Sequence, residues 1–139
     1  MNPLFQQEPI VLDLPDAEII YYPNFMDTME ADAIFSDLKN TIPWQQDEIR
    51  VFGKIHQQPR LTALYGNKDK SYSYSNITMA PNPWIPILDK IKLEVEKICK
   101  TEFTTVLLNY YRDGKDSNGW HADNEKELGE NPIIASMSF

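Results

Sequence analysis

Two segments with helical apolar spacing interrupt a chain whose other segments have strand and turn patterns. In residues 27–42, apolar side chains recur three and four positions apart, and Asp27 fits the helix N-cap. In residues 82–100, a second apolar stripe follows Asn82, the expected cap, with Pro83 at the first helical position. Because strand patterns flank both segments, the sequence predicts an α+β fold.

The rest of the chain alternates short apolar or aromatic runs with Gly, Pro, Asn and Asp, which is typical of strands joined by turns. A chain of 139 residues has room for one hydrophobic core and not for two. We expect a Pro-rich extended arm over residues 1–15 and one domain over residues 16–139. The expected strands lie in residues 18–23, 49–66 (two strands around a loop), 104–112, 120–123 and 133–139.

Composition and charge narrow the class of protein. Hydrophobic residues make up 42% of the chain and no apolar run reaches membrane-span length, so we expect a soluble protein with no membrane partner. The N-terminus lacks a signal-peptide pattern, and the single Cys99, expected as a small buried thiol, cannot form an internal disulfide. We therefore expect an intracellular location, nuclear in a eukaryote and cytoplasmic in a bacterium. The net charge of −8 by itself argues against a nucleic-acid partner.

The pair His121 and Asp123 is the strongest candidate for chemistry. In an extended segment, side chains two positions apart point to the same face, so this imidazole and carboxylate can ligate one metal ion. Such a pair supplies two ligands of a facial triad, which leaves positions open for a cosubstrate and oxygen. The pattern is weak by itself, and the alternative is a surface turn that happens to hold a His.

A second pair, Asn109 and Tyr111, has the same spacing one strand earlier. On a shared face, these side chains could hydrogen-bond a carboxylate-bearing ligand beside the metal. The alternative is a polar residue and a half-buried Tyr on an ordinary sheet.

The run LLNYYRDGKDSNGWHADNEKELGENPIIASMSF, residues 107–139, resembles the central segment of the AlkB family of Fe(II)- and 2-oxoglutarate-dependent dioxygenases. Upstream, VFGK, PRLTALYG, YSYS and PWIPIL follow the order found in the branch that repairs alkylated bases in duplex DNA. The resemblance covers residues 45–139 and, more loosely, the first helix. It implies a double-stranded β-helix, a jelly-roll with flanking helices, of which this chain is the N-terminal portion.

The implied reaction is oxidative demethylation of N-alkylated bases in DNA, such as 1-methyladenine and 3-methylcytosine. Fe(II), 2-oxoglutarate and O2 take part, and the products are formaldehyde, the restored base, succinate and carbon dioxide. The resemblance matches His121 and Asp123 to iron ligands, and Asn109 and Tyr111 to residues that bind 2-oxoglutarate.

The resemblance also implies a base pocket. Tyr72, Ser73 and Tyr74 match the element that lines it, and Tyr74 would stack on a flipped base opposite the first iron ligand. Asn124 stands where this branch usually has an acidic residue, so base preference stays open even if Asn124 contacts the base. Glu125 is expected either to orient neighbouring loop groups or to be solvated.

A DNA-opening hairpin is implied by the match of Val51, Phe52, Gly53 and Lys54. Phe52 would enter the base stack as a wedge, and its alternative is a core phenylalanine on a strand. Lys54 and Arg60 are expected to meet phosphate, which makes alkylated duplex DNA the expected partner.

The resemblance further predicts what the chain lacks, because the family's distal iron-binding His and its 2-oxoglutarate arginines come after the position of Phe139. The other histidine, His56, falls in the hairpin region and is a poor substitute ligand. The domain is thus expected to be C-terminally incomplete, to associate through unpaired strand edges, and to turn over little or nothing alone.

Three hypotheses follow. In the first, the chain is part of a dealkylating dioxygenase. In the second, it is a catalytically dead DNA-binding remnant or a half-barrel completed by a partner. The third is a small, unrelated α+β protein with a structural or zinc-binding His-Asp pair.

Overall fold

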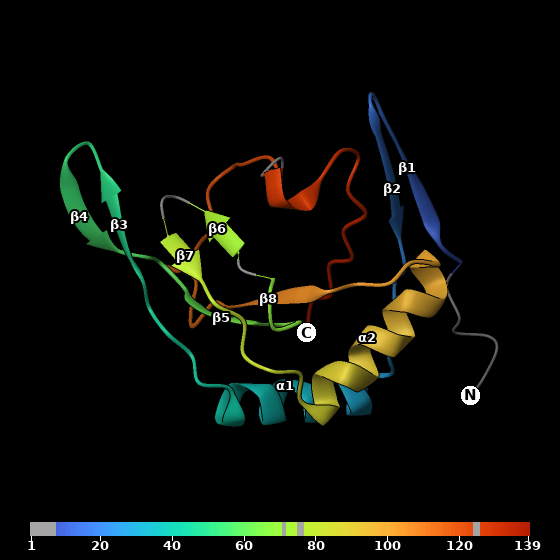
Figure 1. Cartoon of the computed structure of the whole chain (residues 1–139). Helices are drawn as coiled ribbons and strands as arrows, with labels where there is room; N and C mark the ends of the chain where they lie inside the picture. Colours follow the sequence, from blue (N-terminus) through green and yellow to red (C-terminus); the bar gives the residue numbers. More distant parts are fainter. Residues whose placement is uncertain (1–7, 71, 75–76, 124–125) are drawn as a thin grey trace. The chain divides into compact units, whose positions relative to one another are not determined.

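The computed structural model describes residues 8–70, 72–74, 77–123 and 126–139 (Figure 1). The elements in this part of the chain are β1 (Ile10–Leu14), β2 (Ala17–Tyr21), α1 (Thr28–Thr41), β3 (Glu48–Val51), β4 (Lys54–Gln57), β5 (Leu61–Gly66), β6 (Tyr72–Tyr74), β7 (Ile77–Met79), α2 (Pro86–Cys99), β8 (Thr105–Tyr110) and the 3₁₀ helix η2 (Lys126–Leu128). The described strands form four antiparallel pairs, β1–β2, β3–β4, β5–β8 and β6–β7. The chain divides into two compact units, Met1–Asn40 with Phe139, and Thr41–Ser138.

The first unit holds the β1–β2 hairpin and nearly all of α1. The backbone N–H of Glu30 donates to Asp27 Oδ1 at 2.8 Å, which confirms the expected helix cap. Part of the expected extended arm is paired, because β1 runs alongside β2 and a Pro15-Asp16 turn joins them. A Pro-Asp pair between two apolar runs is a turn signal, and it explains why this part of the arm forms a strand.

In the second unit, the β5–β8 ladder forms the most buried part of the sheet structure. Ala63 and Leu64 are each 2% exposed, and Leu108 on β8 is buried opposite Ala63. Gly66 ends β5 where the strands approach closely, since a Cβ there would lie 2.6 Å from Thr105 Cγ2. The two strands are separated in sequence by β6, β7 and α2, yet they lie side by side (Figure 1).

The second helix begins at Pro86, three residues later than the sequence indicates. Ile85 is the N-cap residue, with φ −115° and ψ 155°, and it makes no side-chain cap. The cause is Pro86, because the residue before a proline is kept out of the helical region. Asn82 therefore does not cap the helix, and its Nδ2 donates to the Leu64 carbonyl at 3.0 Å. Cys99, expected as a buried thiol, is only partly buried at the end of α2.

Other expectations also need correction. Residues 49–66 contain parts of three strands rather than two, and residues 120–123 and 133–139 contain none. A strand requires a hydrogen-bonded neighbour, and none of the described strands pairs with residues 133–139. The mixed α+β class is confirmed, but the described pairs do not close into the expected double-stranded β-helix.

No helix in the described part of the chain is long and apolar enough to cross a membrane.

Candidate metal and cosubstrate site

His121 and Asp123 lie together in a segment without strand pairing. His121 Nε2 is 3.4 Å from Asp123 Oδ1, and the two side chains are 51% and 41% exposed. The other ring nitrogen, Nδ1, is 2.8 Å from the Gly119 carbonyl oxygen. Because a carbonyl only accepts, Nδ1 carries a hydrogen, and Nε2 is the ring nitrogen that faces Asp123.

This donor set fits a metal ion. Metal-binding histidines usually donate their second ring N–H to a carbonyl or carboxylate, as Nδ1 does here. One N and one O ligand atom, each about 2.1 Å from a metal ion and at a right angle about it, lie about 3 Å from each other. The observed 3.4 Å needs only a small adjustment of two exposed side chains. Among the described residues, no group of three His, Cys, Asp or Glu side chains is placed to hold a metal ion.

Asn109 lies on β8, directly opposite Thr62 of β5, and its side chain is exposed. Tyr111 follows immediately after the strand and is 44% exposed. Both groups can donate hydrogen bonds to an anionic ligand. The structure thus gives Asn109 a fixed place on the buried ladder.

Arg60 is inside the protein, not on a DNA-facing surface. Its side chain is buried, its Nε donates to Asn109 Oδ1 at 2.9 Å, and its Nη1 donates to the Ser117 carbonyl at 3.3 Å. The expected phosphate contact does not fit this arrangement, because the guanidinium is buried and donates to the protein through Nε and Nη1. Sequence analysis missed this role, since arginine is rarely buried and its partners lie about fifty residues further along the chain.

An ion pair closes the turn before the segment that carries His121 and Asp123. Asp116 receives hydrogen bonds from Arg112 Nε at 2.7 Å, from Arg112 Nη2 at 3.0 Å and from the Arg112 backbone N–H at 2.9 Å. These bonds hold the pKa of the Asp116 carboxyl below its ordinary value and raise the pKa of Arg112. The turn therefore has a defined shape before the chain reaches His121.

The β3–β4 hairpin presents Phe52 at its tip. Phe52 and Gly53 form the two-residue turn with φ of 48° and 76°, the left-handed conformation that tight hairpins favour. Phe52 is fully exposed, which excludes the alternative of a core phenylalanine, and Val51 and Lys54 are exposed beside it. His56, on β4, is exposed as well.

The expected base-pocket residues lie on a short strand. Tyr72, Ser73 and Tyr74 form β6, which pairs with β7. Asn124 and Glu125 lie outside the described residues.

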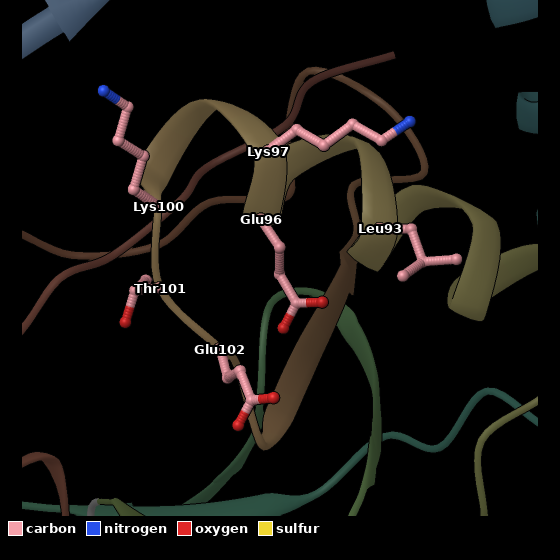
Figure 2. A pocket seen from close by; sticks show the side chains of 6 residues that line it. All are labelled: Leu93, Glu96, Lys97, Lys100, Thr101 and Glu102. Atoms are coloured by element: carbon pink, nitrogen blue, oxygen red, sulfur yellow. The ribbon is translucent and has the colours of Figure 1, made fainter.

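A pocket at the end of α2 holds none of the candidate residues (Figure 2). Its lining residues are Leu93, Glu96, Lys97, Lys100, Thr101 and Glu102. Glu96 has a structural contact there, since its Oε2 accepts from the Phe103 backbone N–H at 2.8 Å.

The chain is similar in sequence to known proteins. The chain is 45% identical over 124 residues to the human alpha-ketoglutarate-dependent dioxygenase alkB homolog 3. This alignment covers 88% of this chain and 43% of the relative. The bovine alkB homolog 3 is 47% identical over 118 residues, covering 84% of this chain and 41% of the relative. The human DNA oxidative demethylase ALKBH2 is 41% identical over 113 residues, covering 79% of this chain and 43% of the relative. The chain thus spans less than half the length of these relatives.

A family model described as the 2OG-Fe(II) oxygenase superfamily matches residues 18–139. This match includes Asn109, Tyr111, His121 and Asp123, and it excludes an unrelated protein with a structural His-Asp pair. The chain belongs to the 2OG-Fe(II) oxygenase superfamily, and among its members it resembles the AlkB homologues.

Proposed function

We propose that this chain is part of a dioxygenase that oxidatively removes alkyl groups from N-alkylated bases in DNA. Membership of the superfamily implies Fe(II) and 2-oxoglutarate as cofactors. A similar protein carries the name DNA oxidative demethylase, which supports the substrate class. The observation that carries the proposal is the 3.4 Å approach of His121 Nε2 to Asp123 Oδ1, with Nδ1 held by the Gly119 carbonyl.

His121 and Asp123 would hold Fe(II) through Nε2 and Oδ1. When bound, Fe(II) and 2-oxoglutarate supply the oxidising chemistry that the side chains themselves lack. Asn109 and Tyr111 would bind 2-oxoglutarate, because the amide and the phenol hydroxyl both donate to carboxylate oxygens. The chain's part in the reaction is therefore to orient the metal and the cosubstrate.

The nucleic-acid contacts belong to the same proposal. The exposed Phe52 would enter the base stack, which offsets the cost of unstacking a base step, and Lys54 would meet a phosphate. Tyr72, Ser73 and Tyr74 would line the pocket for the flipped base, and Asn124 would contact it. Because Phe52 is fully exposed at the tip, its side chain is available as a wedge. A wedge is needed only where a base must leave a duplex, so this exposure favours duplex DNA as the substrate form.

A second function, binding of damaged DNA without turnover, is favoured for the 139-residue chain by itself. Among the described residues, the His121–Asp123 pair has no third metal-binding side chain beside it. A partner that completes the barrel would restore the missing ligand.

The test measures Fe(II) binding to the purified chain without oxygen, and it measures DNA binding and formaldehyde release in air, with Fe(II), 2-oxoglutarate and N-methylated oligonucleotides in single- and double-stranded form. We expect measurable Fe(II) binding, binding of methylated duplex and little or no formaldehyde. His121→Ala should abolish metal binding, whereas His56→Ala, which changes an exposed histidine on the β3–β4 hairpin, should leave metal affinity unchanged. Equal Fe(II) affinity in His121→Ala and wild type would overturn the proposed site. Robust formaldehyde release would instead show that the chain needs no partner.

A further inference from the structure

The buried Arg60 connects the two parts of the proposed site. We infer that Arg60 is a positioning residue that fixes the Asn109 amide and the start of the His121 segment together, so that ligand binding at Asn109 and metal binding at His121 and Asp123 are coupled. This inference rests on the proposed function, and it adds a residue for which the sequence indicated a different role.

The first step concerns the orientation of the Asn109 amide. Arg60 Nε donates to Asn109 Oδ1 at 2.9 Å, and a guanidinium has donors only. The amide must therefore present its oxygen to Arg60, whichever way its two ends are assigned. Its NH2 group then remains as a donor on an exposed side chain, which suits a carboxylate ligand. Without Arg60, either end of the amide could face the ligand.

The second step concerns the segment that carries the metal ligands. Arg60 Nη1 donates to the Ser117 carbonyl at 3.3 Å, and the Ser117 N–H donates to the Pro59 carbonyl at 2.8 Å. Ser117 is thus bound in both directions to the chain entering β5. Two residues later, the Gly119 carbonyl holds His121 Nδ1. The path from Asn109 to the imidazole consists of one side chain and one short stretch of backbone.

The third step concerns rigidity. Arg60 is 7% exposed, and a buried guanidinium is stable only when its donors are satisfied. Its hydrogen bonds therefore cannot be exchanged for water without local rearrangement.

Thr62, directly opposite Asn109 in the ladder, has a fully buried hydroxyl without a hydrogen-bond partner in the described part of the chain. Directly paired residues share a face of the sheet, so unused hydrogen-bonding capacity lies beside the Asn109 amide.

The experiment measures Mn(II) affinity of the purified chain by calorimetry, with and without 2-oxoglutarate. The variants are Arg60→Met, which keeps the side-chain length, and Arg60→Lys, which keeps the charge. Arg50→Met is the matched control, because Arg50 is an exposed arginine on β3. We expect Arg60→Met to weaken Mn(II) binding about 10- to 100-fold, the usual effect of losing a residue that orients metal ligands. Arg60→Lys should recover part of this loss, and Arg50→Met should match wild type.

The coupling provides a readout that a merely structural role would not change. In wild type, 2-oxoglutarate should strengthen Mn(II) binding and Mn(II) should strengthen 2-oxoglutarate binding by the same factor. In Arg60→Met, once circular dichroism has shown that the variant is folded, that factor should fall toward one. An unchanged factor would overturn the inference.

Failure of the inference can be separated from failure of the proposed function. If His121→Ala abolishes Mn(II) binding while Arg60→Met binds like wild type, the metal site stands and the positioning role is wrong. If His121→Ala binds like wild type, the site itself is wrong. Should Arg60→Met not fold, the NMR signal of Arg60 Nε–H in wild type decides the question. It should exchange slowly with water and shift when Zn(II) and 2-oxoglutarate are added, and an unchanged signal would overturn the inference.

Discussion

The β3–β4 hairpin and the β5–β8 ladder are both two-stranded antiparallel pairs, but they differ in almost every other respect. All but one of the hairpin's strand residues are exposed, whereas five of the six residues of β5 are buried. The hairpin closes over a two-residue turn, whereas the ladder joins strands with β6, β7 and α2 between them in sequence. The local pair leaves its side chains available to an external partner, and the long-range pair brings Arg60 and Asn109 together.

The comparison teaches where each part of the proposed site can be built. Of these two pairs, the ladder has the buried surrounding in which the Arg60 guanidinium is held against the Asn109 amide. A wedge must be exposed before it meets DNA, and the hairpin tip provides that exposure. The entropic cost of closing a loop grows only slowly with loop length. Burial of the apolar residues of the ladder can therefore offset the large sequence separation of its two strands.

The largest expected effect comes from truncating the ladder core. Leu64→Ala should lower the free energy of unfolding by about 2–5 kcal/mol, because Leu64 is 2% exposed and its loss leaves a cavity. The matched change in the hairpin, Ile55→Ala, should cost less than about 1 kcal/mol, since Ile55 is 57% exposed. Urea unfolding of both variants measures the difference. Equal losses would mean that the two pairs do not differ in burial as described.

Two glycines sharpen the comparison, because each is required for a different reason. Gly66→Ala should cost about 1–3 kcal/mol through overlap with Thr105 Cγ2 and the Thr104 carbonyl. Gly53→Ala, at the hairpin tip, has open space but a φ of 76°, and should cost about 1–2 kcal/mol.

Asparagine at the two glycine positions separates space from backbone conformation. Gly53→Asn should recover most of the loss, since Asn tolerates a positive φ. Gly66→Asn should be worse than Gly66→Ala, because the added atoms meet backbone. Thermal unfolding measures all four variants, and recovery at Gly66 would contradict the close approach of β5 and β8.

The parts of the structure that the sequence predicts are those in which the cause is local. The Asp27 cap and the exposed Phe52-Gly53 tip depend on neighbours within a few residues, and both are confirmed. The start of α2 was predicted wrongly although its cause, Pro86, is also local, because Asn82 and Pro83 gave a competing cap signal.

The candidate site could be predicted only in part, for a physical reason. The spacing of His121 and Asp123 brings their side chains together even without the expected strand, so the 3.4 Å approach needs no long-range pairing. Arg60 is different, because its burial depends on a partner on another strand, and no spacing in the sequence signals that pairing. The expected strand over residues 133–139 also depends on a neighbour, which the described strands do not supply.

A smaller, pH-dependent effect is expected from the turn after the ladder. The pKa of Asp116 is lowered in the folded state, chiefly by the hydrogen bonds from Arg112, below its ordinary value of 3.8. The ion pair therefore stabilises the fold above about pH 4, and this contribution is lost as the pH falls through the lowered pKa. Melting curves between pH 6 and pH 2.5 should show a steeper loss in wild type than in Asp116→Asn. The exposed Asp69→Asn is the control and should follow wild type; identical slopes for all three would contradict a working ion pair.

The smallest effect on stability, and the sharpest contrast with Leu64, is expected at Phe52. The side chain is fully exposed, so Phe52→Ala should change the free energy of unfolding by no more than about 0.5 kcal/mol. Affinity for a methylated duplex should nevertheless fall, because the variant lacks the side chain proposed as the wedge that offsets unstacking, while affinity for the same strand unpaired should change little. Fluorescence anisotropy with both DNA forms tests this, and Val51→Ala beside the tip shows how much any nearby truncation matters. A loss of stability would mean that Phe52 packs against the protein, and an equal loss on single and double strands would mean that it binds bases without opening the duplex.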